Sequence, residues 1–139
     1  MNMYLVFALL SALFAALVTI IAKLALQNIE PTLLTSVRAV IMALLLIVLS
    51  LFEGDLYNVL RFTSKDWLFV TLAALFGALS WLFYFVALKL APNVKGVYAI
   101  DRFSVVLVVF LAWLILHETL TWRAVVGSLL VFFGVLLMN

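Results

Sequence analysis

The stretch from Trp67 to Leu88 contains no Asp, Glu, Lys or Arg. A helix that crosses a bilayer needs about 20 mostly apolar residues, and this stretch meets that requirement. The rest of the chain has a similar character. Of its 139 residues, 70% are hydrophobic and 10% are charged, whereas ordinary globular domains have roughly 45–50% and about 25%. A chain this short cannot bury so much apolar surface in one core, so we expect the surplus to face lipid.

Apolar stretches of membrane-spanning length recur along the whole chain. They cover roughly residues 3–26, 32–52, 67–90, 96–116 and 121–138. The sequence therefore predicts an all-α fold, a polytopic membrane helix bundle of about five transmembrane helices, within a single transmembrane domain over residues 1–139. We expect a multi-pass protein of a prokaryotic inner membrane.

The links between these stretches carry helix start signals. Pro31 suits the first turn of the second span, and Thr63 or Ser64 can cap the third. Thr119 or Thr121 can cap the fifth. The one long link, residues 53–66, mixes apolar and polar side chains. A short helix on the membrane surface and an irregular loop are both open there.

Basic residues on the two sides of the predicted bundle are nearly balanced. The N-terminal side carries Arg61, Lys65 and Arg123, and the other side carries Lys23, Lys89 and Lys95. The positive-inside rule therefore gives almost no orientation. Insertion in both directions, followed by pairing as an antiparallel homodimer, would reproduce with two chains the inverted repeats of many transporters. The alternative is one topology, with the second side in the cytoplasm.

Several polar or ionisable side chains lie inside the predicted spans, where each is costly and calls for an explanation. By helical rise, Arg38, Asp101 and Arg102 lie roughly 8–10 Å inside the second surface. Trp81 and Tyr84 fall about 9–14 Å from the same surface, and Tyr98 is a little shallower. Their spacing puts them on one stripe of each helix, so we expect one shared polar layer.

Two interpretations of this layer are open. In the first, the layer lines a cavity in which Arg38 and Arg102 bind an anionic or zwitterionic solute. Asp101 forms an ion pair with one of these arginines or binds a cation, and Trp81 and Tyr84 form the walls of the cavity. In the second, an Arg38–Asp101 pair joins two helices, and Arg102 snorkels to the interface.

The other ionisable groups have simpler expected roles. We expect Lys23, at the end of the first span, to snorkel to the surface. We expect Glu118 to form an ion pair with Arg123 at the membrane rim. A proton-coupling role for Glu118 or Asp101 remains open.

Small residues at helical spacing predict close helix contacts, within one chain or between two. The helix-packing candidates are Ala12, Ala16, Gly77, Gly127 and Gly134.

No catalytic pattern is present in the sequence. His117-Glu118 begins like a metalloprotease motif, but Thr121 stands where the second His is required. With one His and no Cys, we expect neither an enzyme, a metal site nor a cofactor. The basic residues are spread over the chain, so we expect no nucleic-acid partner.

The second half of the chain resembles the drug/metabolite transporter superfamily, EamA-type, in its short five-span branch. Glu118-Thr119-Leu120-Thr121, followed by a span with Gly127 and the ending Phe133-Gly134-Val135-Leu136-Leu137, looks like that family's last two helices. Residues 81–88, residues 99–109 and Arg38-Ala39 are similar to its other spans. The resemblance implies half of an inverted-repeat transporter, paired as a homodimer and moving small metabolites. Longer members usually have a Pro near positions 101–102, where this chain has Asp101-Arg102.

The function predicted first is therefore transport of a small solute by alternating access. Two other functions are open. One is a non-transporting membrane subunit that assembles with a partner complex, and the other is a lipid flippase, whose polar layer would open sideways to lipid.

Overall fold

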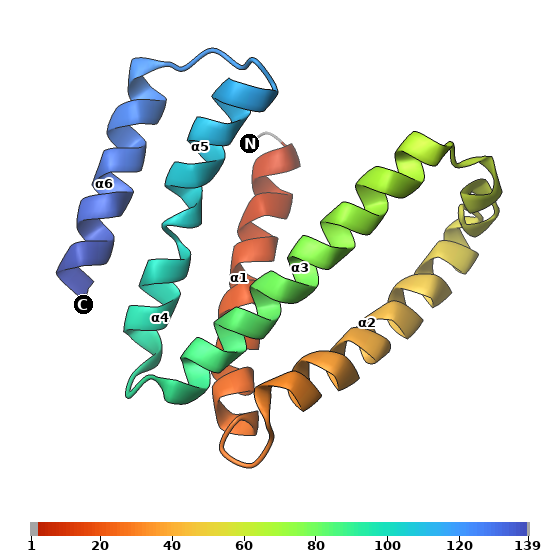
Figure 1. Ribbon diagram of the computed structural model, residues 1–139, viewed down its shortest axis with the longest axis horizontal. Coiled ribbons are helices and arrows are strands. Elements are labelled where there is room, and N and C mark those ends of the chain that lie inside the picture. Colours follow the sequence, from red (N-terminus) through yellow and green to blue (C-terminus); the bar gives the residue numbers. More distant parts are fainter. Residues whose placement is uncertain (1–2, 139) are drawn as a thin grey trace. The chain divides into compact units, whose positions relative to one another are not determined.

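The computed structural model describes residues 3–138, and those residues form helices joined by short links (Figure 1). The elements are α1 (Met3–Ala25), α2 (Pro31–Glu53), the 3-10 helix η1 (Leu56–Arg61), α3 (Ser64–Leu90), α4 (Val94–Asp101), α5 (Ser104–Ile115) and α6 (Trp122–Met138). Within this described range, four stretches are long and apolar enough to cross a membrane, namely α1, α2, α3 and Val94–Ile115, and α6 is a shorter apolar helix. The predicted all-α polytopic bundle is confirmed.

The chain forms two compact units. The first comprises Met1–Ile21 with Leu90–Asn139, and the second comprises Ala22–Lys89. The single domain over residues 1–139 stays a prediction.

In the first unit, α6 packs against both halves of the preceding span. It lies beside α5 and α4 (Figure 1). The rings of Phe103 and Phe132 meet with their centroids 5.8 Å apart. The buried Ser128 hydroxyl donates to Ala124 O at 2.8 Å, so this polar side chain is satisfied within its own helix, as a lipid environment requires.

The fourth span is interrupted, which the sequence did not predict. Between α4 and α5 the amide of Arg102 donates to Ala99 O at 3.0 Å, and the amide of Phe103 donates to Ile100 O at 2.9 Å. The amide of Val105 likewise donates to Arg102 O at 3.0 Å. These are tight bonds spanning three residues, typical of a short 3-10 insertion at a functional hinge or a strained sequence. Asp101 favours such a break because Asp is a weak helix former.

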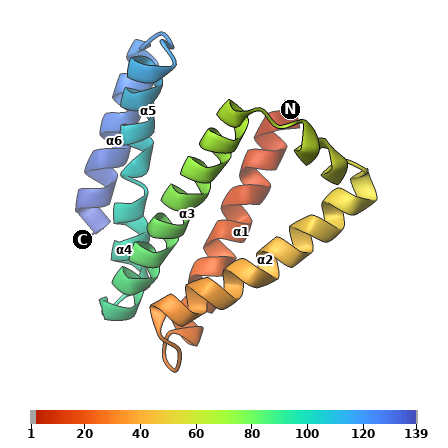
Figure 2. The ribbon, with the colours of Figure 1, turned by 45° about the vertical axis from the view of Figure 1, so that its right-hand side comes forward.

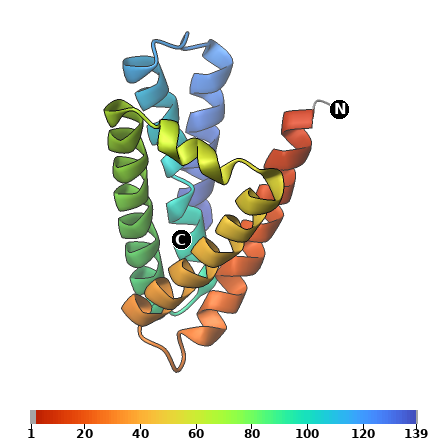
Figure 3. The same cartoon turned by 90° about the vertical axis from the view of Figure 1, so that its right-hand side faces the viewer.

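In the second unit, α2 and α3 are joined at their far ends by η1 and held together at their near ends. Figures 2 and 3 show the two helices close together at one end and splayed apart toward η1. At the near end, Lys89 Nζ lies 2.6 Å from Glu30 Oε1. The helix η1 confirms a short helix in the long link, although in the 3-10 form.

Helix termini follow several of the predicted signals. Pro31 opens α2. Thr63 and Asp66 form a reciprocal cap on α3, in which the Thr63 amide donates to Asp66 Oδ2 at 2.9 Å and the Asp66 amide donates to Thr63 Oγ1 at 3.3 Å. Thr121 Oγ1 accepts from the Ala124 amide at 3.2 Å and caps α6.

Most of the large apolar side chains are exposed. Among the described residues of α2, only Pro31 is buried. The buried core of the second unit includes Phe85 and Leu88, which are 0% exposed. Water would make such a surface aggregate, so the exposed helices fit a lipid environment.

Candidate solute-binding site

Arg38 lies on the aromatic face of α3. Its guanidinium carbon, Cζ, is 3.8 Å from the centroid of the Trp81 ring and 5.3 Å from that of Phe85. Arg38 is half-buried, as is Leu34 one turn earlier, whereas most of α2 is exposed. The guanidinium therefore lies against aromatic rings, and a cation–π contact of this kind gains strength where water is excluded.

The rings under Arg38 form one cluster on α3. Trp81 and Tyr84 have centroids 5.9 Å apart, with planes at 88°. Phe85 contacts both, at 5.4 Å from Trp81 and 5.9 Å from Tyr84. Because Phe85 is fully buried, the platform on which Trp81 rests is fixed by packing. The sequence analysis did not select Phe85, although it lies four residues after Trp81 and hence on the same helix face.

A second polar group lies at the interruption between α4 and α5. Arg102 Nη2 is 3.5 Å from Asp101 Oδ2, and Arg102 Cζ is 4.4 Å from the centroid of the Tyr98 ring. Arg102 Nε is buried and has no hydrogen-bond partner within the described part of the chain. The Asp101 carboxylate therefore offsets much of the charge of Arg102, and the Tyr98 ring covers the guanidinium.

Six site residues were predicted from the sequence, and the structure brings them together in two groups. Arg38, Trp81 and Tyr84 belong to the first group, in the second unit. Tyr98, Asp101 and Arg102 form the other, in the first unit. The polar layer shared by both groups stays a prediction.

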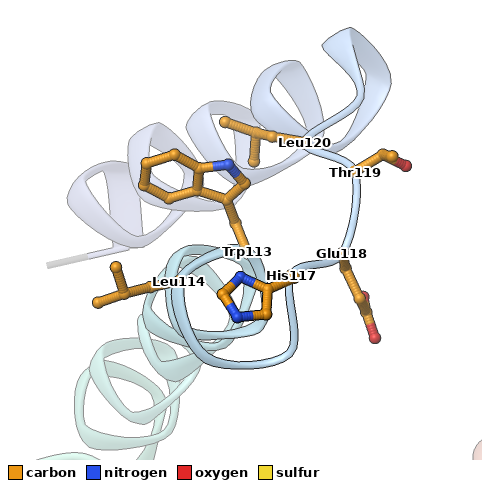
Figure 4. A pocket seen from close by; sticks show the side chains of 6 residues that line it. All are labelled: Trp113, Leu114, His117, Glu118, Thr119 and Leu120. Carbon is orange, nitrogen blue, oxygen red and sulfur yellow. The ribbon is translucent and has the colours of Figure 1, made fainter.

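Glu118 lies in the link between α5 and α6, at the rim of a cavity of about 420 Å³. Trp113, Leu114, His117, Thr119 and Leu120 complete the lining (Figure 4). His117 has a φ of 55°, a left-handed conformation that turns the chain after α5. The Glu118 side chain points away from α6 (Figure 4). In the described residues Glu118 has no ion pair with Arg123, so the expected rim pair is not formed.

Lys23 contacts protein, although snorkelling to the surface was expected. Its ammonium donates to Leu88 O at 2.6 Å, at the C-terminal end of α3. A cation is favourable there because the last carbonyls of a helix carry partial negative charge. Lys23 therefore fastens the end of α1 to the end of α3.

The predicted helix-packing residues are largely uncovered by their own chain. Ala12, Ala16 and Gly127 are exposed, and Gly77 and Gly134 are half-buried. A Cβ added at Gly77, Gly127 or Gly134 would meet nothing within 4 Å. Their role in close helix contacts stays a prediction.

Comparison with known proteins resolves the kind of protein to which these helices belong. The model of the EamA-like transporter family matches residues 2–139. The chain belongs to this family. An uncharacterized transporter encoded in the cobO 3′ region of a Sinorhizobium species is 33% identical over 131 residues, which cover 94% of this chain and 92% of that relative. No solved structure matches the chain. This EamA-family protein is accordingly an integral, multi-pass membrane protein of transporter type.

Proposed function

We propose that this EamA-family protein carries a small anionic or zwitterionic solute across a prokaryotic inner membrane, as an antiparallel homodimer with alternating access. The observation that carries the proposal is the placement of the Arg38 guanidinium on Trp81, within a membrane-spanning helix. Placing a charged guanidinium inside the membrane costs free energy, so such residues are commonly functional. Binding of an anionic solute would explain the position of Arg38. The proposed translocation residues are Arg38, Trp81, Tyr84, Tyr98, Asp101 and Arg102.

Exposed helix faces support the proposed dimer. The sides of α2 that do not face α3 are uncovered, and so are small residues such as Ala12 and Gly127. A second copy in the opposite orientation would cover such faces through close helix contacts. The match to the Sinorhizobium relative covers 92% of that protein, so a relative of similar length exists.

The interrupted span supports the alternating-access part of the proposal. In many transporters discontinuous helices form the substrate and ion sites around which alternating access takes place. Here the interruption falls beside the Asp101–Arg102 pair. Asp101 and Glu118 are the candidates for coupling transport to an ion.

Topology reporters test the dimer. We expect a C-terminal fusion to alkaline phosphatase and a matched fusion to green fluorescent protein both to give signal, because the chain inserts both ways. Removing charge on one side with R61Q and K65Q is expected to fix one orientation, and K95Q is expected to bias the other. The two biased variants are expected to transport only when co-expressed. Signal from a single side in the unaltered chain would exclude an antiparallel dimer of identical chains.

Variants of Arg38 test the carrier itself. If the protein is a transporter, the R38Q variant is expected to insert and assemble but to lose uptake of the anionic or zwitterionic solute into proteoliposomes. A non-transporting subunit would instead lose its partner complex or show no change. Flux unaltered by R38Q would remove Arg38 from the translocation pathway.

A further inference from the structure

The stacking of Arg38 leaves its hydrogen-bonding edge unused. A guanidinium has five N–H donors, all in its plane, and the plane's two faces carry no donors. Arg38 Cζ lies over the Trp81 ring, 3.8 Å from its centroid, a separation that fits face-to-face stacking of the guanidinium on the ring. Stacking of this kind and bidentate hydrogen bonding along the edge are compatible, because they use different parts of the same group.

Acidic groups within the second unit are engaged elsewhere or lie at its other end. Glu30 pairs with Lys89, and Asp66 is held in the cap with Thr63. Asp55 accepts from Asn58, and Glu53 is exposed at the end of α2 opposite to Pro31. Within residues 22–89 Arg38 therefore has aromatic partners and no carboxylate partner.

Arg102 differs from Arg38 in this respect. Its charge is opposed by Asp101 at 3.5 Å, in the neighbouring position of the chain. An anion approaching Arg102 also meets the Asp101 carboxylate, whereas an anion approaching Arg38 meets a cation on an aromatic platform. The two arginines are thus unequal as anion sites.

We propose that Arg38 is a carboxylate receptor, in which two N–H groups on the edge of the guanidinium donate to the two oxygens of a planar carboxylate. Trp81, which rests on Phe85, fixes the plane of the guanidinium. This inference rests on the proposed transport function and narrows its cargo to small metabolites that carry a carboxylate. A planar carboxylate matches the fork of a guanidinium, and the pair is stronger than a neutral hydrogen bond. Trp81 and Tyr84 add ring surface for an apolar part of the same solute.

Binding of three matched probes to the purified, detergent-solubilised protein tests the proposal. Benzoate, its neutral isostere benzamide and the cation benzylammonium have the same ring and differ in the group offered to Arg38. Isothermal titration is expected to show saturable binding of benzoate that exceeds that of benzamide by about tenfold or more. Equal affinities for benzoate and benzamide, or no saturable benzoate binding, would overturn it.

Variants then assign the preference to Arg38. R38Q is expected to abolish the difference between benzoate and benzamide, and R38K to retain part of it, because Lys offers a point charge without the fork. R61K removes a guanidinium from the exposed helix η1 and keeps the positive charge there, so it is the matched control for R38K and is expected to keep the full preference. A benzoate preference that survives R38Q contradicts the proposal.

A measurement on the unaltered chain tests the proposal even if the R38Q variant fails to fold. Phenylglyoxal modifies accessible guanidinium groups, and peptide mass spectrometry identifies the arginines modified. Benzoate is expected to protect Arg38 and to leave Arg61 reactive, whereas benzamide protects neither. Modification of Arg38 that benzoate does not slow would count against the receptor.

These results separate the receptor from the transporter. If proteoliposomes accumulate solute and R38Q is without effect on benzoate preference, transport stands and the receptor is wrong. If the purified chain prefers benzoate through Arg38 but moves no solute, the receptor stands and the proposed transport is wrong.

Discussion

The guanidinium carbon of Arg38, on α2, lies 3.8 Å from the centroid of the Trp81 ring, on α3. Because α2 and α3 splay apart toward η1 (Figure 2), this contact lies among the few that fasten α2 to its neighbour. The same contact therefore bears on both stability and binding, and the two effects are separable by experiment.

Replacing Trp81 with Leu is expected to lower the free energy of unfolding by about 1–2 kcal/mol beyond the effect of lost ring surface, because the cation–π contact is removed. Trp81→Phe keeps a ring and is expected to cost less. Thermal unfolding in detergent, followed by circular dichroism, measures the difference. Trp122→Leu is the matched control, since Trp122 is 78% exposed. Equal effects of the Leu variants at positions 81 and 122 would contradict the role of stacking.

Lys23→Met is expected to destabilise the second unit by about 1–2 kcal/mol, because Leu88 O loses a charged donor at a helix C-terminus. Lys23→Arg should retain most of the stability. Hydrogen exchange is the most direct measurement, with faster exchange expected at the end of α3. Lys95→Met, at an exposed position, serves as control. Unchanged exchange near Leu88 in the K23M variant would mean that Lys23 does not hold this helix end.

Thr63→Ala is expected to cost about 1 kcal/mol, because it removes the hydroxyl that caps α3 and orients Asp66. Thr63→Ser keeps the hydroxyl and is expected to be nearly neutral. Denaturation midpoints of the two variants provide the test. A Ser variant as unstable as the Ala variant would show that the cap does not account for the loss.

The ion pair between Lys89 and Glu30 is expected to contribute little, in spite of its short distance of 2.6 Å. The Glu30 side chain is 76% exposed, and exposed pairs contribute about 0.2–1 kcal/mol that salt screens. A double-mutant cycle with E30Q and K89Q, repeated at high salt, measures the coupling. A coupling energy well above that range, insensitive to salt, would show that the pair is shielded from water.

Replacing Asp101 and Arg102 together with Leu is expected to extend α4 into α5, because Leu is a far better helix former than Asp. Amides of residues 103–106 should then exchange more slowly. The same change is expected to reduce flux, since the interruption is lost with the charges. V108L with V109L, inside α5, is the control for altered bulk. Exchange at 103–106 that stays fast would attribute the interruption to other residues.

The spans and caps could be predicted from the sequence because they depend on local properties. Long apolar runs and residues such as Pro31, Thr63 and Thr121 act within a few positions of themselves, and all three lie where expected. The interruption at Asp101 was missed because an apolar run of spanning length gives no sign of a local change in hydrogen bonding.

Side-chain partners were harder to predict, since they depend on geometry between helices. Lys23 was expected at the lipid surface but reaches a backbone carbonyl 65 positions away. Glu118 was expected to pair with Arg123, but the left-handed turn at His117 directs it away from α6. Phe85 was missed because its spacing of four residues from Trp81 is its only mark, and most residues of an apolar helix are apolar.

The adjacency of Asp101 and Arg102 also affects how the chain is made. The two opposite charges lie on neighbouring residues, so this ion pair can form as soon as the fourth span has been synthesised. Arg38 has no such neighbour, and its platform on α3 is synthesised more than 40 residues later. We therefore expect Arg38 to acquire its aromatic partner only after α3 has been synthesised.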